Sequence, residues 1–333
     1  MPRQPTLERL YEELLTRYGR EIADAFVAAV QDMATAADLQ QLITAIEAGN
    51  LEAAIAALNI EQASYSPVLE AIRSGYVESG NLSASAIRLA TIRFDVRNPR
   101  AERWLTDHSS TLVREIISDQ RVAVRQALTA GMERGENPRT TALNIVGRLN
   151  RQTGKRENGI LGLTSVQEQY VRNAQAELES GDPAQLRAYL ERARRSKVFD
   201  RAVRKAVESG EAIPAETVRK AIAAYRGRLL KLRGDMIGRT EALTALRAAQ
   251  HESYLQAAEA GKIAESAVRK VWRDASDLRV RHTHRVMDGQ SVGLRETFVS
   301  PSGARLLYPG DPSAPAAERI GCRCVASYLV KFL

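Results

Sequence analysis

Cysteine, aromatic residues and long apolar runs are all scarce in this chain of 333 residues. It contains 2 cysteines, and 5% of its residues are Phe, Trp or Tyr. Two cysteines cannot support a disulfide framework, which predicts a reducing compartment. No run approaches the roughly eighteen apolar residues that cross a bilayer. The opening residues, MPRQPTLERL, lack the apolar core of a signal peptide. We therefore expect no membrane segment and a protein that is made in the cytoplasm.

Several enzyme motifs are missing as well. The sequence has no glycine-rich phosphate loop, no H-E-x-x-H metal motif and no nucleophile elbow. Its few aromatic residues do not alternate with basic ones, as they do on many surfaces that stack nucleic-acid bases. These absences count against an enzyme, and we expect no small-molecule substrate.

Helix-forming residues dominate what is present. Ala, Leu, Arg and Glu are abundant, and this mixture favours α-helices. The predicted fold class is mainly α, with an elongated helical body and a small C-terminal α+β module. We expect three consecutive parts: an N-terminal helical region (1–100), a basic helical body (101–235) and the C-terminal module (236–333).

Turn residues divide the first hundred residues. Apolar spacing predicts several short amphipathic helices before residue 80, with turns at Gly49-Asn50 and Gly80-Asn81. Alternation over residues 92–96 indicates a short extended piece ahead of Asn98-Pro99.

Caps outline the helices that follow. We expect one helix from a Ser109/Ser110 cap to Gly135 and another that starts at Pro138. After a polar loop at 151–162, a capping box of Ser165 and Glu168 predicts a helix to about Leu178.

A much longer helical pattern follows Pro214. Its apolar spacing persists to near Ala260, which would make a helix of about 70 Å if it is unbroken. Gly227, Gly234 and Gly238 could bend it or let another helix approach, so the sequence leaves its continuity open. Such a long helix is more typical of scaffolds than of compact enzymes.

Basic residues are concentrated around this helix. Residues 201–250 contain 11 basic and 5 acidic side chains. This excess could face packaged DNA without sequence preference, or it could be an ordinary solvated helix surface. The candidate DNA contacts are Arg219, Lys220, Arg226, Arg228, Lys231 and Arg233.

Short strands are predicted near the C-terminus. VRKVWRD, from Val268, reads as a strand, and Asp288-Gly289 is a turn signal. Phe298-Val299, residues 306–308 and the segment CRCVASYLV are further candidates. Trp272 and Phe298 are expected in the core of this module.

Four side chains of the module could bind a metal: His282, His284, Cys322 and Cys324. Two imidazoles and two thiolates would complete a tetrahedral zinc site, which stabilises small modules. On a strand both histidines would share one face, whereas on a helix only one could serve. Alternatively, the cysteines are core residues and the histidines lie on the surface. A third reading makes His284, near Asp288, a general base, or gives the metal an open position for phosphodiester cleavage.

Several segments together resemble the phage Mu F-like family of minor head proteins. They are RTEALTALRAAQ, W-R-D-x-x-D-x-R-x-R-x-x-H-R-V-M-D-G, a later Phe, P-G-D-P and C-R-C. Upstream, FDVRNPRAERWL and GENPRTTALNIV are similar to the longer members. The resemblance extends over about residues 90–333 and is most specific in 236–326.

The resemblance implies a structural role in a tailed-phage or prophage head. Such a protein would bind portal and capsid subunits at the portal vertex, act in head assembly or genome delivery, and belong to the virion after assembly in the host cytoplasm. A metal-dependent nuclease or phosphodiesterase that uses the C-terminal histidines and cysteines is the alternative.

The family motif maps onto three short stretches of this chain. They are Arg239-Thr240-Glu241, His284 ahead of the Asp288-Gly289 turn, and Cys322-Arg323-Cys324. Many members have a histidine shortly before the final cysteines, where this chain has Glu318-Arg319-Ile320-Gly321. His282 would then have to supply the fourth metal ligand. Arg239 and Glu241 are expected to pair with the charged turn of the module.

Overall fold

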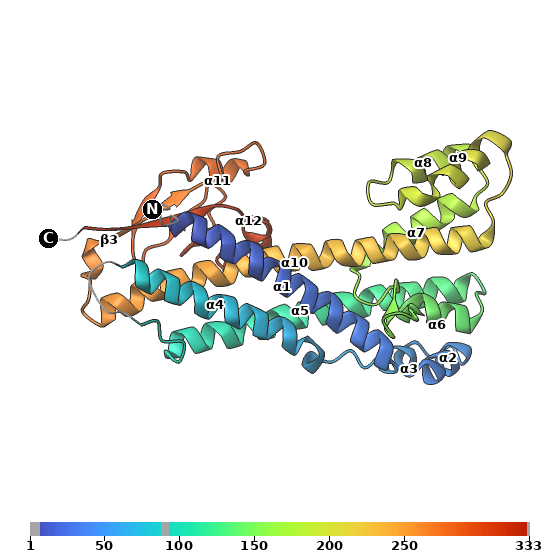
Figure 1. Cartoon of the computed structure of the whole chain (residues 1–333), viewed down its shortest axis with the longest axis horizontal. Coiled ribbons are helices and arrows are strands. Elements are labelled where there is room, and N and C mark those ends of the chain that lie inside the picture. Colours follow the sequence, from blue (N-terminus) through green and yellow to red (C-terminus); the bar gives the residue numbers. More distant parts are fainter. Residues whose placement is uncertain (1–6, 88–92, 332–333) are drawn as a thin grey trace. The chain divides into compact units, whose positions relative to one another are not determined.

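The computed structural model describes residues 7–87 and 93–331, and most of them are helical (Figure 1). The mainly α fold class, with a small C-terminal sheet region, is confirmed. The longer helices are α1 (Leu7–Ala36), α4 (Ser66–Ala86), α5 (Pro99–Glu133), α7 (Ser165–Glu179) and α10 (Ala215–Glu259). The shorter ones are α2 (Leu39–Glu47), α3 (Leu51–Ala56), α6 (Pro138–Val146), α8 (Pro183–Glu191), α9 (Asp200–Ser209), α11 (His282–Val286) and α12 (Ala316–Arg319). Single 3₁₀ turns occupy Gln62–Tyr65, Lys197–Phe199 and Glu265–Ala267.

The chain forms two compact units, and neither is one continuous segment. The first unit contains Met1–Ala25, Pro67–Thr111 and Asp235–Leu333, and the second contains Phe26–Ser66 and Leu112–Gly234. This division differs from the three consecutive parts expected from the sequence. The difference arises because α1, α5 and α10 each contribute residues to both units.

The N-terminal helices are longer than the turn signals predict. Gly49 does form a turn, with φ of +68°, and Asn50 caps α3. Gly80, however, lies inside α4, so the turn predicted there is wrong. A Cβ at Gly80 would lie 2.3 Å from the ring of Phe94, which shows that this glycine makes room for an aromatic side chain. Residues 93–98 form no strand, and Ile92, also part of the expected extended piece, lies outside the described residues.

The α5 helix begins ten residues earlier than predicted. Asn98 Oδ1 accepts a hydrogen bond from the Arg100 amide at 2.9 Å, and Pro99 occupies the first helical position. This cap and proline start the helix, and Ser109 lies within it. Its end is as expected, since Gly135 has φ of +63° and α6 starts at Pro138.

The capping box of α7 differs from the prediction by one residue. Thr164 caps the helix: its Oγ1 accepts from the Gln167 amide, and Gln167 Oε1 accepts from the Thr164 amide. The predicted partner, Glu168, instead lies 2.9 Å from Arg172 one turn later. The expected loop at 151–162 includes a short strand, β2 (Arg156–Glu157). It pairs with β1 (Arg148–Leu149) in an antiparallel two-stranded hairpin.

The α10 helix is a single element of 45 residues, which corresponds to about 68 Å at 1.5 Å per residue. Its glycines permit close approach by other segments. A Cβ at Gly238 would lie 2.1 Å from the Gly19 carbonyl oxygen, and one at Gly227 would lie 2.1 Å from Asn158 Oδ1. The helix predicted after Pro214 is therefore continuous.

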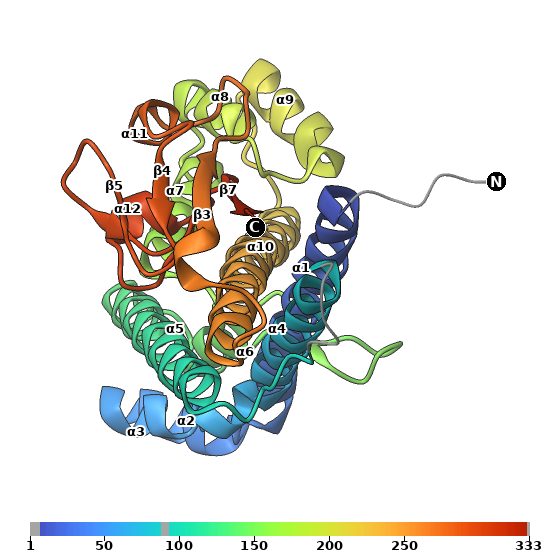
Figure 2. The ribbon, with the colours of Figure 1, turned by 90° about the vertical axis from the view of Figure 1, so that its left-hand side faces the viewer.

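The C-terminal sheet has three antiparallel strands. β3 (Val268–Arg273) lies between β4 (Ser291–Gly293) and β7 (Val325–Val330), with Trp272 opposite Ala326 (Figure 2). A separate hairpin pairs β5 (Phe298–Val299) with β6 (Arg305–Leu306). β3, β5 and β7 follow the predicted strands, β6 overlaps its predicted segment only at Leu306, and β4 was not predicted.

Large apolar side chains fill the space between the sheet and the hairpin. Trp272, Phe298 and Leu306 are fully buried and pack with Met287 and both cysteines. The rings of Trp272 and Phe298 meet edge to face, with centroids 5.2 Å apart. Their predicted place in the module core is confirmed, and this core forms one wall of the site described below.

Candidate metal centre

The α11 helix decides which histidine faces the core. Residues two apart on a helix point about 200° away from each other. His284 is accordingly buried, at 1% exposure, while His282 is exposed. The expectation that His282 acts as a fourth ligand is therefore not met, because its side chain lies outside the cluster that contains His284.

The two cysteines lie just before β7 and point the same way. Cys322 and Cys324 are each 2% exposed, and neither forms a disulfide. Arg323, between them, points outward and binds both carboxylate oxygens of Asp277. The spacing of one residue thus places two sulfur atoms on the inner side of an extended segment.

His284 and the cysteines together form a compact donor set. His284 Nδ1 lies 3.6 Å from Cys322 Sγ and 3.4 Å from Cys324 Sγ, and the three donor atoms all lie within 4.8 Å of one another. Zinc bonds of about 2.3 Å to sulfur and about 2.0–2.1 Å to nitrogen, at a tetrahedral angle, separate those two atoms by about 3.6 Å. The residues therefore fit a thiophilic cation, although the same distances also suit S–H···N hydrogen bonds.

A buried carboxylate, Glu318, lies behind the imidazole. Its Oε2 is 2.8 Å from His284 Nε2 and also accepts from Thr283 Oγ1 at 3.2 Å. Its Oε1 accepts from Ser300 Oγ at 3.0 Å and from Ser302 Oγ at 2.6 Å. Sequence reasoning gave this residue no role in the site, although it lies only four residues before Cys322. The reading that pairs His284 with Asp288 is wrong, because Glu318 holds that position.

Arg247 of α10 adds a buried positive charge. Its Nη1 donates to the carbonyls of Pro309, at 3.3 Å, and Cys322, at 3.4 Å. Its Nη2 is buried and has no hydrogen-bond partner among the described residues. Arg247 thus connects α10 to the P-G-D-P loop and to the cysteine segment, another role that the sequence did not reveal.

Electrostatics favour charge separation inside this cluster. The neighbouring Cys324 thiol, with His284 and Arg247, lowers the pKa of Cys322 despite its burial. The pKa of Cys324 is raised, because it donates to Cys322 and is itself buried. Burial opposes protonation of His284, but Cys322 and Glu318 raise its pKa overall. Zinc binding would release protons from this cluster, because zinc takes deprotonated thiolates and a neutral imidazole.

The Arg-Thr-Glu motif has a different partner from the one predicted. Glu241 is buried and pairs with His108 of α5, with Oε2 and Nε2 2.5 Å apart. Thr240 is also buried, and Arg239 is exposed. The expected pairing of Glu241 with the module's charged turn is wrong, because His108 occupies its carboxylate.

The predicted Asp288-Gly289 turn is present between α11 and β4. Asp288 Oδ1 accepts from the Asp274 amide at 3.0 Å, and Gly289 has φ of +79°. The Gly289 amide donates to the Trp272 carbonyl at 2.9 Å. The turn therefore fixes the end of β3 and the start of β4.

Two of the six candidate DNA contacts are buried. Arg226 donates to Asn144 Oδ1 at 3.0 Å, and Arg233 donates to the Gly162 carbonyl at 2.9 Å. Because these two arginine residues are only 6% and 7% exposed, the expectation that they contact DNA is wrong. The other four candidates, Arg219, Lys220, Arg228 and Lys231, are exposed on α10.

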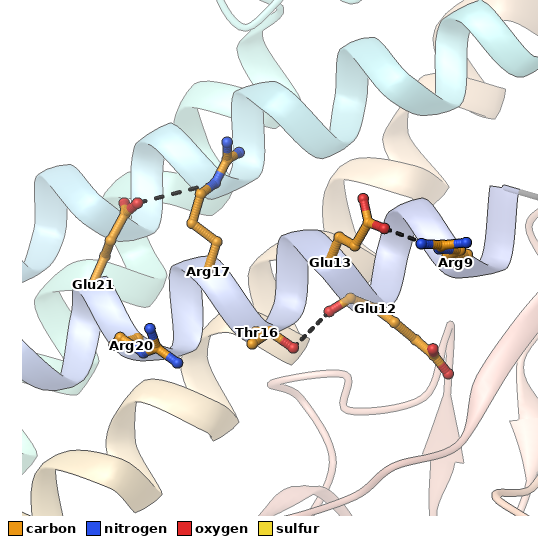
Figure 3. Close-up of a pocket in the computed structure, with 7 residues that line it drawn as sticks. All are labelled: Arg9, Glu12, Glu13, Thr16, Arg17, Arg20 and Glu21. Atoms are coloured by element: carbon orange, nitrogen blue, oxygen red, sulfur yellow. Dashed lines mark hydrogen bonds and ion pairs between the residues drawn. The ribbon is translucent and has the colours of Figure 1, made fainter. Parts of the chain in front are cut away.

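A hollow along the start of α1 lacks the features of a site. It is lined by Arg9, Glu12, Glu13, Thr16, Arg17, Arg20 and Glu21, all of them exposed. Figure 3 shows their side chains spread along one helix, with Arg9 facing Glu13 and Arg17 facing Glu21. This is a solvated surface of mixed charge. No helix among the described residues is long and apolar enough to cross a membrane.

Fold and site together define a mainly helical protein whose small C-terminal module contains a buried His–Cys–Cys cluster. Residues 197–327, from the turn before α9 to β7, match the family described as Phage Mu protein F like protein. This stretch is similar to that family, and the resemblance predicted from the sequence is confirmed over these residues.

Part of the chain is similar to a curated protein. The uncharacterized protein YqbB of Bacillus subtilis (strain 168) is 36% identical over 94 residues, or 27% of this chain. The alignment spans 28% of that protein. No solved structure matches significantly.

Proposed function

We propose that this protein is a minor head protein of a tailed phage or prophage that acts by binding during head assembly or genome delivery. The match of residues 197–327 to the Mu F-like family carries this proposal. Its partners would be portal and capsid subunits, so its final location would be the virion. The α10 helix supports a scaffold role, because a helix of 45 residues is more typical of scaffolds than of compact enzymes.

A structural zinc ion would close the C-terminal module. The donor set is soft and compact, and its three side chains are between 1% and 2% exposed. Buried cysteine–histidine sites commonly stabilise small modules whose apolar cores are limited. Here the ion would tie α11 to the segment before β7, which are separated by 38 residues at His284 and Cys322.

The nuclease alternative has one observation in its favour. Three protein ligands leave a fourth metal position, which catalytic zinc sites fill with water or substrate. Burial of all three donors argues against access by a nucleic-acid strand. Catalysis would require turnover of DNA or RNA by the purified protein, with loss of turnover but not of fold in His284→Ala.

Copurification with the portal protein of the same phage or prophage tests the assembly role. The full chain and the portal are produced together, and the portal is captured through an affinity tag. We expect the wild type and His282→Ala to remain bound, because His282 is exposed and outside the cluster. In His284→Ala the thermal unfolding transition of the module should disappear. Portal binding that depends on the folded module should be lost with it. Failure of the wild-type chain to bind portal or assembled heads would refute the proposal.

Non-specific DNA binding remains a second proposed activity. It would use the exposed side chains Arg219, Lys220, Arg228 and Lys231. Part of their charge is already compensated, since Glu216 lies within ion-pair distance of both Arg219 and Lys220. Binding of this kind falls steeply with salt and shows little sequence preference. A salt-insensitive, sequence-selective complex would contradict it.

A further inference from the structure

Glu318 is outside the donor set but determines how the imidazole of His284 is presented. Glu318 is 5% exposed, and its Oε2 lies 2.8 Å from His284 Nε2. An ionised carboxylate can only accept hydrogen bonds, so Nε2 must carry the proton. The other ring nitrogen, Nδ1, lies 3.4–3.6 Å from the two sulfur atoms. A proton fixed on Nε2 leaves the Nδ1 lone pair for a cation bound between imidazole and thiolates.

Three hydroxyl groups restrain the carboxylate itself. Thr283, next to His284 on α11, binds Oε2, while Ser300 and Ser302 of the β5–β6 turn bind Oε1. Both carboxylate oxygens are therefore engaged, and rotation of the Glu318 side chain would break several hydrogen bonds. A buried carboxylate with this many donors is held at one position and one orientation.

We propose that Glu318 is the positioning residue of a Cys₂His metal centre and fixes His284 in the tautomer that binds a thiophilic cation through Nδ1. This inference rests on the structural metal of the proposed function. Metal-binding histidines generally donate their second ring N–H to a carboxylate or carbonyl, which sets ring orientation and raises ligand basicity. Here the chain supplies that acceptor from α12, four residues before the first cysteine. The specific consequence is coordination by Nδ1.

Zinc affinity of the full chain, measured by competition with a chromophoric chelator, tests this role. Glu318→Ala should weaken zinc binding by about 10- to 100-fold, the usual effect of losing such a partner. Glu318→Gln should weaken it less, because glutamine still accepts from Nε2 but lacks the charge. Ser302→Ala should have a smaller effect of the same sign. Glu265→Gln, which alters a half-exposed ion pair with Arg295 in the same module, should leave affinity unchanged.

Cadmium-113 NMR of protein with nitrogen-15-labelled histidine identifies the coordinating atom. We expect scalar coupling between cadmium-113 and Nδ1 of His284, together with weaker zinc binding by the Glu318 variants. Wild-type zinc affinity in Glu318→Ala, or coupling through Nε2, would overturn the role of Glu318 while leaving the metal centre intact. Absence of zinc and cadmium binding by the wild type would overturn both. If Glu318→Ala does not fold, Glu318→Gln, Ser302→Ala and the coupling pattern decide.

Discussion

Two glycines that face each other across the α1–α10 contact should respond oppositely to substitution by alanine. A Cβ at Gly238 would meet the Gly19 carbonyl oxygen at 2.1 Å and the Ala23 amide nitrogen at 2.9 Å. A Cβ at Gly19 would meet nothing nearer than 3.8 Å, which is ordinary van der Waals contact. Each variant therefore serves as the control for the other.

The expected magnitudes follow from two opposing effects. Replacing glycine by alanine inside a helix contributes about 0.8–1.0 kcal/mol of stability. Overpacking typically costs about 1–3 kcal/mol. The cost of a clash with backbone atoms should lie near the upper end of this range, because a backbone atom cannot move aside through a side-chain rotation. Gly238→Ala should thus destabilise the protein by about 2 kcal/mol. Gly19→Ala should stabilise it by up to about 1 kcal/mol.

Urea denaturation followed by circular dichroism provides the measurement. The transition midpoint should fall for Gly238→Ala and rise or stay constant for Gly19→Ala, with similar slopes in both. Midpoints that shift in the same direction, or a stabilised Gly238→Ala protein, would refute the close approach of these helices.

Two further predictions concern acid stability and DNA. Burial, with nearby Lys270, Arg295 and Arg100, lowers the pKa of His251 well below 6.5. The unfolded chain gains a proton there that the folded chain excludes, so stability should fall below pH 6.5 by up to about 1.4 kcal/mol per pH unit. His251→Gln should lose less stability than wild type between pH 7.5 and 5.5, and equal losses would contradict this assignment. Arg219→Gln with Lys231→Gln should weaken DNA binding and reduce its salt slope by about two. Wild-type binding by this double variant would place the DNA contact elsewhere.

Local sequence signals predicted much of the fold. The α10 helix, the C-terminal ends of α5 and α7, and the strands around Trp272 all follow from apolar spacing and caps within a few residues. The errors occur where a distant contact outweighs a local signal. Gly80 was expected to turn the chain but lies inside a helix, because the ring of Phe94 fills the space above it.

The candidate site was only partly predictable for the same reason. Cys322 and Cys324 are close in sequence, so their shared direction follows from backbone geometry. Selection of His284 over His282 required knowledge that α11 is helical. The roles of Glu318 and Arg247 depend on contacts with residues far away in the chain, and sequence spacing carries no direct sign of them. The burial of Arg226 and Arg233 was not predictable either, since basic residues on a long helix can be buried by neighbouring helices.

Metal content tests the central claim that a metal closes the C-terminal module. It is measured by elemental analysis, with a thiol titration, on full-length wild type, Cys322→Ser and His282→Ala. We predict one zinc ion per chain in the wild type and in His282→Ala, and none in Cys322→Ser. A wild-type protein without metal, whose two thiols react only after denaturation, would contradict the claim and identify Cys322 and Cys324 as core residues.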